Sequence, residues 1–149
     1  LFDSTLANWM GVAPGLCSVS AECGHAGVIE YNGDVYSCDH FVFPEHRLGN
    51  ITNKTITEMM YSEQQQQFAR MKTAMLPQQC KECKFLFACH GECPKNRFVA
   101  DRYGNPNLNY LCQGYHIFFE HAAPYMDFMR GELAAQRPPA NVMNAIISK

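Results

Sequence analysis

The chain has 149 residues, of which 47% are hydrophobic and 17% charged, so its length and composition are those of one folded domain. The net charge of -2 at pH 7 argues against a nucleic-acid partner, and no apolar run is long enough to span a bilayer. The first residues lack the basic and apolar regions of a signal peptide. Leu1 indicates either a processed product or a piece cut from a longer polypeptide, and we expect the second. We therefore expect a cytoplasmic protein, in a reducing compartment where thiols stay free.

A β-hairpin is predicted in the first third of the chain. β-branched and aromatic residues at about 27–31 and 34–38 flank the dipeptide Asn32-Gly33, which favours a type I′ turn. Such a hairpin returns the chain to the place it left. It would therefore bring Cys23, just before the first strand, close to Cys38, at the end of the second.

A loop and two helices are predicted next. Residues 41–50 read as a loop. Thr55 and Glu58 form a capping-box pattern at the start of a short helix over about 56–61. Ser62 is expected to cap a second helix, which ends before the next proline.

The last third of the chain is predicted to be helical after an irregular connection over about 94–109. The apolar spacing indicates an amphipathic helix over 109–122, and Pro124 suits the first turn of a further helix that extends to about Gln136. We expect one domain over 1–136, followed by a C-terminal tail over 137–149.

Eight cysteines are the unusual feature of the composition. Their spacing is Cys17-x5-Cys23-x14-Cys38, then Cys80-x2-Cys83-x5-Cys89-x3-Cys93, then Cys112. A disulfide framework is disfavoured because a domain of this length can fold without that many disulfide cross-links. Two structural zinc sites with four thiolates each are the main alternative to an iron–sulfur protein, although the second C-x2-C pair usual in a zinc ribbon is missing. A catalytic cysteine is disfavoured because two sites of four thiolates use all eight cysteines.

Iron–sulfur ligation explains more of the spacing. The C-x2-C-x5-C-x3-C-P run resembles the bacterial ferredoxin run, in which the last cysteine, followed by proline, binds the other cluster. By this logic one cluster is held by Cys80, Cys83, Cys89 and Cys112. The other is held by Cys93 together with Cys17, Cys23 and Cys38. Each cluster then has four thiolate ligands, one for each iron.

The same residues resemble a known family. The spacing Cys23-x9-Gly33-x4-Cys38, Cys80-x2-Cys83-x5-Cys89-x3-Cys93 and Cys112 is similar to the seven-cysteine signature of the SPASM domain, an auxiliary-cluster domain of radical S-adenosylmethionine enzymes. The segments CGHAGVIEYNGDVYSCDHFVFPEHRLGNI, LPQQCKECKFLFACHGECPKNRF and LNYLCQGYHIFF resemble anaerobic sulfatase-maturating enzymes, over about Phe2 to Leu133. Cys17, upstream of the signature, is also a feature of that subfamily.

The resemblance implies an α+β fold, with a small hairpin, helices and irregular loops wrapped around two 4Fe-4S clusters. In such enzymes a separate N-terminal barrel with a C-x3-C-x2-C cluster cleaves S-adenosylmethionine, and the radical formed starts the oxidation of a sulfatase Cys or Ser to Cα-formylglycine. This chain has no C-x3-C-x2-C, so alone it should be inactive. The implied role is electron transfer and positioning of the substrate peptide. The implied partners are the sulfatase polypeptide, the barrel, and a flavodoxin- or ferredoxin-type electron carrier.

One acid matches a position to which the resemblance assigns a catalytic role. Asp39, directly after Cys38, corresponds to the acid proposed to take the substrate proton. Partial burial beside an anionic cluster would raise its pKa, which suits a general base. The alternative is that Asp39 only caps the turn that leaves the hairpin. His25, His40 and His90 are expected to be hydrogen-bond donors near the ligands or surface groups, because the cysteines already number eight.

Overall fold

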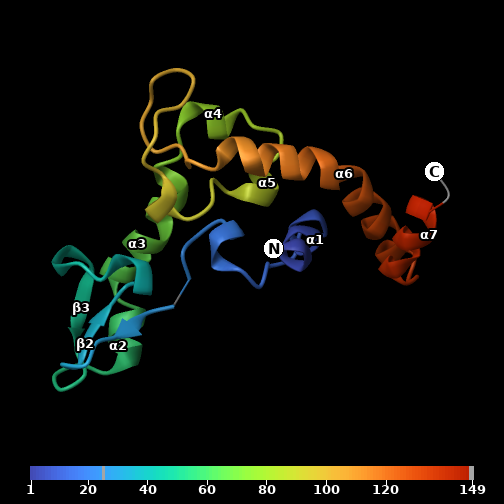
Figure 1. Ribbon diagram of the computed structural model, residues 1–149. Helices are drawn as coiled ribbons and strands as arrows, with labels where there is room; N and C mark the ends of the chain where they lie inside the picture. The colour runs from blue at the N-terminus through green and yellow to red at the C-terminus, as the bar shows by residue number, and fades with distance from the viewer. Residues whose placement is uncertain (25, 148–149) are drawn as a thin grey trace.

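The structure, a computed structural model, describes residues 1–24 and 26–147, and it has the predicted α+β architecture. A small antiparallel sheet lies at one end of an elongated molecule, and a long helix extends toward the other end (Figure 1). The helices and strands are α1 (Phe2–Trp9), β1 (Val28–Ile29), β2 (Asp34–Tyr36), β3 (Arg47–Asn50), α2 (Ile56–Met60), α3 (Glu63–Ala74), α4 (Gln78–Lys81), α5 (Leu86–Cys89), α6 (Cys112–Ala134) and α7 (Val142–Ile147). None of the helices in the described ranges combines the length and apolar character that a bilayer span requires.

The predicted hairpin is confirmed, but its turn differs from the expected type. β1 and β2 pair antiparallel with Ile29 opposite Val35. Only Gly33 of the turn has a positive φ, at 84°, and its N–H donates to the carbonyl of Glu30. Because Asn32 does not share this conformation, the loop is a type I turn closed by a left-handed glycine and not a type I′ turn.

A third strand occupies part of the segment predicted as a loop. β3 pairs with β2, with Gly49 opposite Val35, and the register shifts between Val35 and Tyr36. Leu48 is buried against Met59 and the sheet. The strand has no alternating apolar pattern of its own, so its pairing is decided by β2, which is distant in sequence.

The two predicted helix starts after the sheet are confirmed. Thr55 and Glu58 form both hydrogen bonds of the capping box at the start of α2. Ser62 accepts a hydrogen bond from the backbone N–H of Gln65 at the start of α3. α3 connects the sheet to the region that carries α4 and α5 (Figure 1).

The prediction of two helices on either side of Pro124 is wrong, because α6 continues through this proline. An internal proline removes one helical hydrogen bond and costs about 3 kcal/mol. The buried residues Phe119, Ala122, Met126 and Met129 lie on both sides of Pro124 in one core, and this shared packing offsets the cost.

Helices at both ends of the chain were not predicted. Trp9 of α1 and Val142 of α7 are buried in the same core as Phe119 of α6. The segment expected to be a tail thus contains a 3-10 turn over Pro139–Asn141 followed by α7, while residues 148–149 lie outside the described part. Short helices of this kind are stabilised by packing and not by propensity.

Candidate metal centres

The first predicted set of cysteines lines one cavity of about 150 Å³. Its members come from four separate segments: the 3-10 turn after α1, the approach to β1, the exit from β2, and the segment after α5. They are Cys17, Cys23, Cys38 and Cys93. The hairpin brings Cys23 and Cys38 together as expected, and Phe41 and Phe68 supply apolar walls.

The second predicted set lines a separate cavity of about 310 Å³. Cys80 lies in α4, Cys83 in the turn that follows, Cys89 is the last residue of α5, and Cys112 is the first residue of α6. These elements lie together around the start of α6 in Figure 1. Two short helices and the end of a long one thus direct four thiols to one space.

The thiols are spaced more widely than a single ion requires. Four sulfurs at about 2.3 Å from one zinc ion lie roughly 3.8 Å from one another. Among the described residues, the cysteine sulfurs form no group of three within 4.8 Å of one another. Two cavities, each lined by four separated thiols, therefore fit a cofactor larger than one ion, and soft thiolates are the ligands of iron–sulfur clusters.

Burial raises the pKa of six of these thiols and so favours their protonated form in the metal-free chain. Desolvation raises the pKa of Cys89 to about 12 and that of Cys80 to about 11. It also raises the pKa of Cys38 to about 11, with smaller opposing effects from a backbone hydrogen bond. Metal ligands are thiolates, so binding at either cavity must release protons.

The loop between Cys89 and Cys93 joins the two cavities and has an unusual backbone. Its three residues, His90, Gly91 and Glu92, all have left-handed φ angles, at 48°, 70° and 56°. This sequence of conformations turns the chain so that Cys89 lines the second cavity and Cys93 the first. The ferredoxin-like division of the cysteines thus corresponds to a sharply turned loop.

Arg97 fills the inside of that loop. Its guanidinium donates four hydrogen bonds of 2.6–2.9 Å, all to backbone carbonyls. The acceptors belong to His90, Gly91, Glu92 and Lys72. A single buried side chain therefore fixes the loop and ties it to α3.

Lys72 is the second buried cation of the region. Its side chain is 0% exposed, lines the first cavity, and donates to the carbonyls of Cys17 at 2.7 Å and Ser18 at 2.8 Å. Burial lowers the pKa of Lys72, and the nearby thiol of Cys23, as an anion, raises it. Sequence analysis missed both Lys72 and Arg97, because nothing in the local pattern distinguishes them from surface residues.

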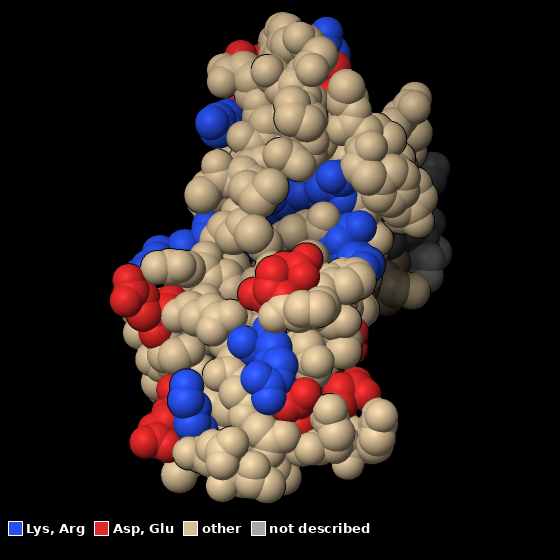
Figure 2. Space-filling view, turned by 90° about the vertical axis from the view of Figure 1, so that its left-hand side faces the viewer, with Lys and Arg blue, Asp and Glu red and all other residues tan. Residues whose placement is uncertain are grey.

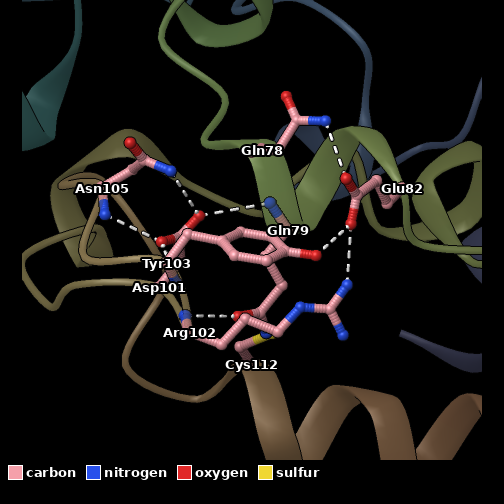
Figure 3. A network of polar contacts seen from close by, with 8 residues as sticks. All are labelled: Gln78, Gln79, Glu82, Asp101, Arg102, Tyr103, Asn105 and Cys112. Carbon is pink, nitrogen blue, oxygen red and sulfur yellow. Dashed lines mark hydrogen bonds and ion pairs between the residues drawn. The ribbon is translucent and has the colours of Figure 1, made fainter.

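Gln79 provides a side-chain donor at the second cavity (Figure 3). Its Nε2 lies 3.8 Å from Cys112 Sγ, and its Oε1 accepts from the backbone N–H of Arg102 at 2.9 Å. Since the carbonyl oxygen is occupied by an N–H donor, the amide nitrogen must face the sulfur. Asp101 stabilises this arrangement by accepting from the backbone N–H groups of Gln79, Tyr103 and Asn105.

Asp39 lies beside the first cavity but differs from expectation in its environment. It is exposed, and Cys38 Sγ donates to its carboxylate at 3.2 Å. This hydrogen bond lowers the pKa of Asp39, whereas partial burial was expected to raise it. The hydrogen bond needs a protonated thiol, so it would be lost when Cys38 binds a metal as thiolate.

Two described histidines, His40 and His116, line the cavities, one at each. His40 lines the first cavity, with Nδ1 3.6 Å from Cys93 Sγ. His90 belongs to the loop held by Arg97. His25 lies outside the described residues.

The surface carries charges of both signs. Figure 2 shows Lys and Arg interspersed with Asp and Glu over the face that contains the sheet. Arg47 pairs with Asp34 there, and Arg102 pairs with Glu82 beside the second cavity. Opposite charges therefore lie side by side at both of these places.

Residues 17–84 match the family model of SPASM, an iron-sulfur cluster-binding domain. The chain carries a SPASM domain. The family predicted from the sequence is thereby confirmed, while Cys89, Cys93 and Cys112 lie beyond the matched residues.

Curated relatives extend the match over nearly the whole SPASM chain. A serine-type anaerobic sulfatase-maturating enzyme of Bacteroides thetaiotaomicron is 64% identical, over 98% of this chain and 35% of its own length. A cysteine-type anaerobic sulfatase-maturating enzyme of Clostridium perfringens is 32% identical, over 83% of this chain and 33% of its own length. The SPASM chain thus spans about a third of the length of the curated relatives it matches.

A solved structure shares the fold of the SPASM chain. Native anSMEcpe with bound AdoMet and Cp18Cys peptide superposes with a TM-score of 0.73 at 30% identity, over 89% of this chain and 36% of that one. The α+β architecture around the two cavities is therefore similar to that of the corresponding part of native anSMEcpe.

Proposed function

We propose that the chain is the auxiliary-cluster domain of an enzyme that oxidises a sulfatase side chain to Cα-formylglycine, and that it holds two 4Fe-4S clusters. The observation that carries this proposal is the pair of cavities, each lined by four separated thiols. Cys17, Cys23, Cys38 and Cys93 would hold one cluster, and Cys80, Cys83, Cys89 and Cys112 the other. A bound cluster would supply a one-electron acceptor: forming the aldehyde removes two electrons from the substrate, of which one leaves with the hydrogen atom that the radical takes and the other needs an acceptor.

The chain's own residues would hold the clusters, exclude water and take up a proton. Phe41 and Phe68 at the first cavity, and Phe85 and Phe119 at the second, reduce solvent access to the thiols. The sulfatase peptide, the radical-forming barrel and a flavodoxin- or ferredoxin-type carrier are the proposed partners. We propose a cytoplasmic location because the free thiols require a reducing compartment.

Anaerobic reconstitution of the 149-residue chain with iron and sulfide tests the cluster proposal. We expect about eight irons and eight sulfides per chain and a brown protein with broad visible absorption. A colourless protein that retains two zinc ions and takes up no iron would instead establish a zinc-binding interaction module.

Asp39 is the proposed general base. In the full-length enzyme, Asp39→Asn is expected to reduce the formylglycine yield from a serine peptide by roughly 100-fold or more, because an amide cannot accept the substrate proton. The serine substrate is chosen because the relative at 64% identity is serine-type. Mass spectrometry of the peptide measures the yield. Asp127→Asn, at an exposed carboxylate on α6, is the control, and an unchanged yield with Asp39→Asn would remove Asp39 from the mechanism.

A further inference from the structure

Two cations are buried between the thiol sets without a carboxylate partner. Lys72 is 0% exposed and Arg97 is 6% exposed. Their side chains donate to backbone carbonyls, and neither takes part in an ion pair with any residue in the described ranges. Burying a cation is costly unless an opposite charge lies nearby, and carbonyl dipoles compensate only in part.

Thiolates of the two sets can supply the missing negative charge. Lys72 lines the first cavity together with Cys17, Cys23 and Cys93. Arg97 lies inside the loop that joins Cys89 of the second set to Cys93 of the first. Its hydrogen bond to the carbonyl of Lys72 also links the two cations through the backbone of α3.

We propose that Lys72 is the internal counter-charge of the first cluster and that Arg97 is a counter-charge shared by both clusters. This inference rests on the proposed function, because it requires anionic clusters in the two cavities. A cluster bound by four thiolates is anionic, and its reduction adds another negative charge. A fixed cation stabilises the reduced form more than the oxidised form and so raises the reduction potential.

The arrangement makes the two sites unequal. The first site has the buried ammonium of Lys72 in its wall and shares Arg97. The cations that line the second cavity, Lys84 and Arg102, are instead exposed and neutralised by Glu120 and Glu82. Removal of the Lys72 charge should therefore affect the first cluster more than the second. Removal of the Arg97 charge should affect both.

Redox titration of the reconstituted chain, followed by electron paramagnetic resonance, tests the proposal. Lys72→Met keeps most of the apolar stem and removes the charge. At the potential where half of the first clusters of the unmodified chain are reduced, we expect about a tenfold lower ratio of reduced to oxidised cluster, which corresponds to about 59 mV for one electron. Lys72→Arg should restore most of the shift, and Arg97→Met should lower both potentials.

Lys54→Met is the matched control, since Lys54 is exposed and lines neither cavity. It should leave both potentials unchanged. The signal of the first cluster is assigned in a Cys80→Ala/Cys83→Ala background, which lacks two thiols of the second cavity. An unchanged first potential in Lys72→Met, or an equal shift in Lys54→Met, would overturn the inference while leaving the cluster count intact. Failure of the unmodified chain to bind iron would instead contradict the proposed function.

A second measurement separates a counter-charge from a structural lysine. Lys72→Met should lower the unfolding free energy more in the cluster-loaded chain than in the metal-free chain, because the protonated thiols of the latter supply no negative charge. If Lys72→Met lowers the unfolding free energy equally in both forms, Lys72 only stabilises the fold by its hydrogen bonds to the carbonyls of Cys17 and Ser18, and the proposal is contradicted.

Discussion

Replacing Cys89 and Cys93 together by alanine is expected to remove nearly all iron from the reconstituted chain, from about eight irons to about none. The two residues are close in sequence, but Cys89 lines the second cavity and Cys93 the first. Each site then has three thiols and a solvent-exposed position. We expect such sites to lose their clusters during anaerobic gel filtration, after which iron and sulfide are measured.

The matched variant is Cys17→Ala/Cys93→Ala, which removes two thiols from one cavity and none from the other. It should retain about four irons per chain. If the run from Cys80 to Cys93 held a single cluster, the results would be reversed, with Cys89→Ala/Cys93→Ala keeping half of the iron. The pair of variants therefore tests the division of the ligands as well as their number.

Gly91→Ala is expected to lower the free energy of unfolding by about 2–4 kcal/mol. Gly91 has φ at 70°, and an added Cβ would lie 2.4 Å from Leu76 Cδ2 and 2.8 Å from Arg97 Nη2. Leu76 is buried and Arg97 is held by four hydrogen bonds, so neither can move away freely. Denaturant unfolding of the metal-free chain measures the loss.

Gly104→Ala separates the backbone effect from the packing effect. Gly104 also has a left-handed φ, at 84°, but no atom lies within 4 Å of the position of an added Cβ. We expect a loss of about 1–2 kcal/mol there, from the conformation alone. Equal losses for the two variants would mean that the interior of the loop accommodates a methyl group, against the tight packing of Arg97.

Helix starts were predicted correctly from the sequence where a few adjacent residues determine them. The capping residues Thr55 and Ser62 begin α2 and α3 as predicted, because a cap satisfies N–H groups within the next turn. The cysteine spacing predicted which thiols would lie together, and the structure places each set of four at one cavity. The prediction came from the ferredoxin-like run, in which the last cysteine, followed by proline, binds the other cluster, since Cys89 and Cys93 are close in sequence but line different cavities.

The features that sequence analysis missed depend on contacts between distant segments. β3 exists because β2 offers it a partner, and α6 continues through Pro124 because its apolar residues share one core. Lys72 occurs in a helix rich in glutamine, where a lysine normally faces solvent. Only the folded chain shows that this lysine is enclosed by the segment of Cys17 and the loop held by Arg97.

The core around α6 can form only after residues from both ends of the chain have been synthesised. It joins Trp9, Phe85 and Val142, and Cys83 and Cys89 pack against it. Contacts of such large sequence separation slow folding, since the chain between them must be closed into a loop first. Because synthesis runs from the N-terminus, every cysteine is made before Val142 can complete the core, so the thiols of the second cavity are accessible to cluster-delivering or oxidising agents before this packing forms.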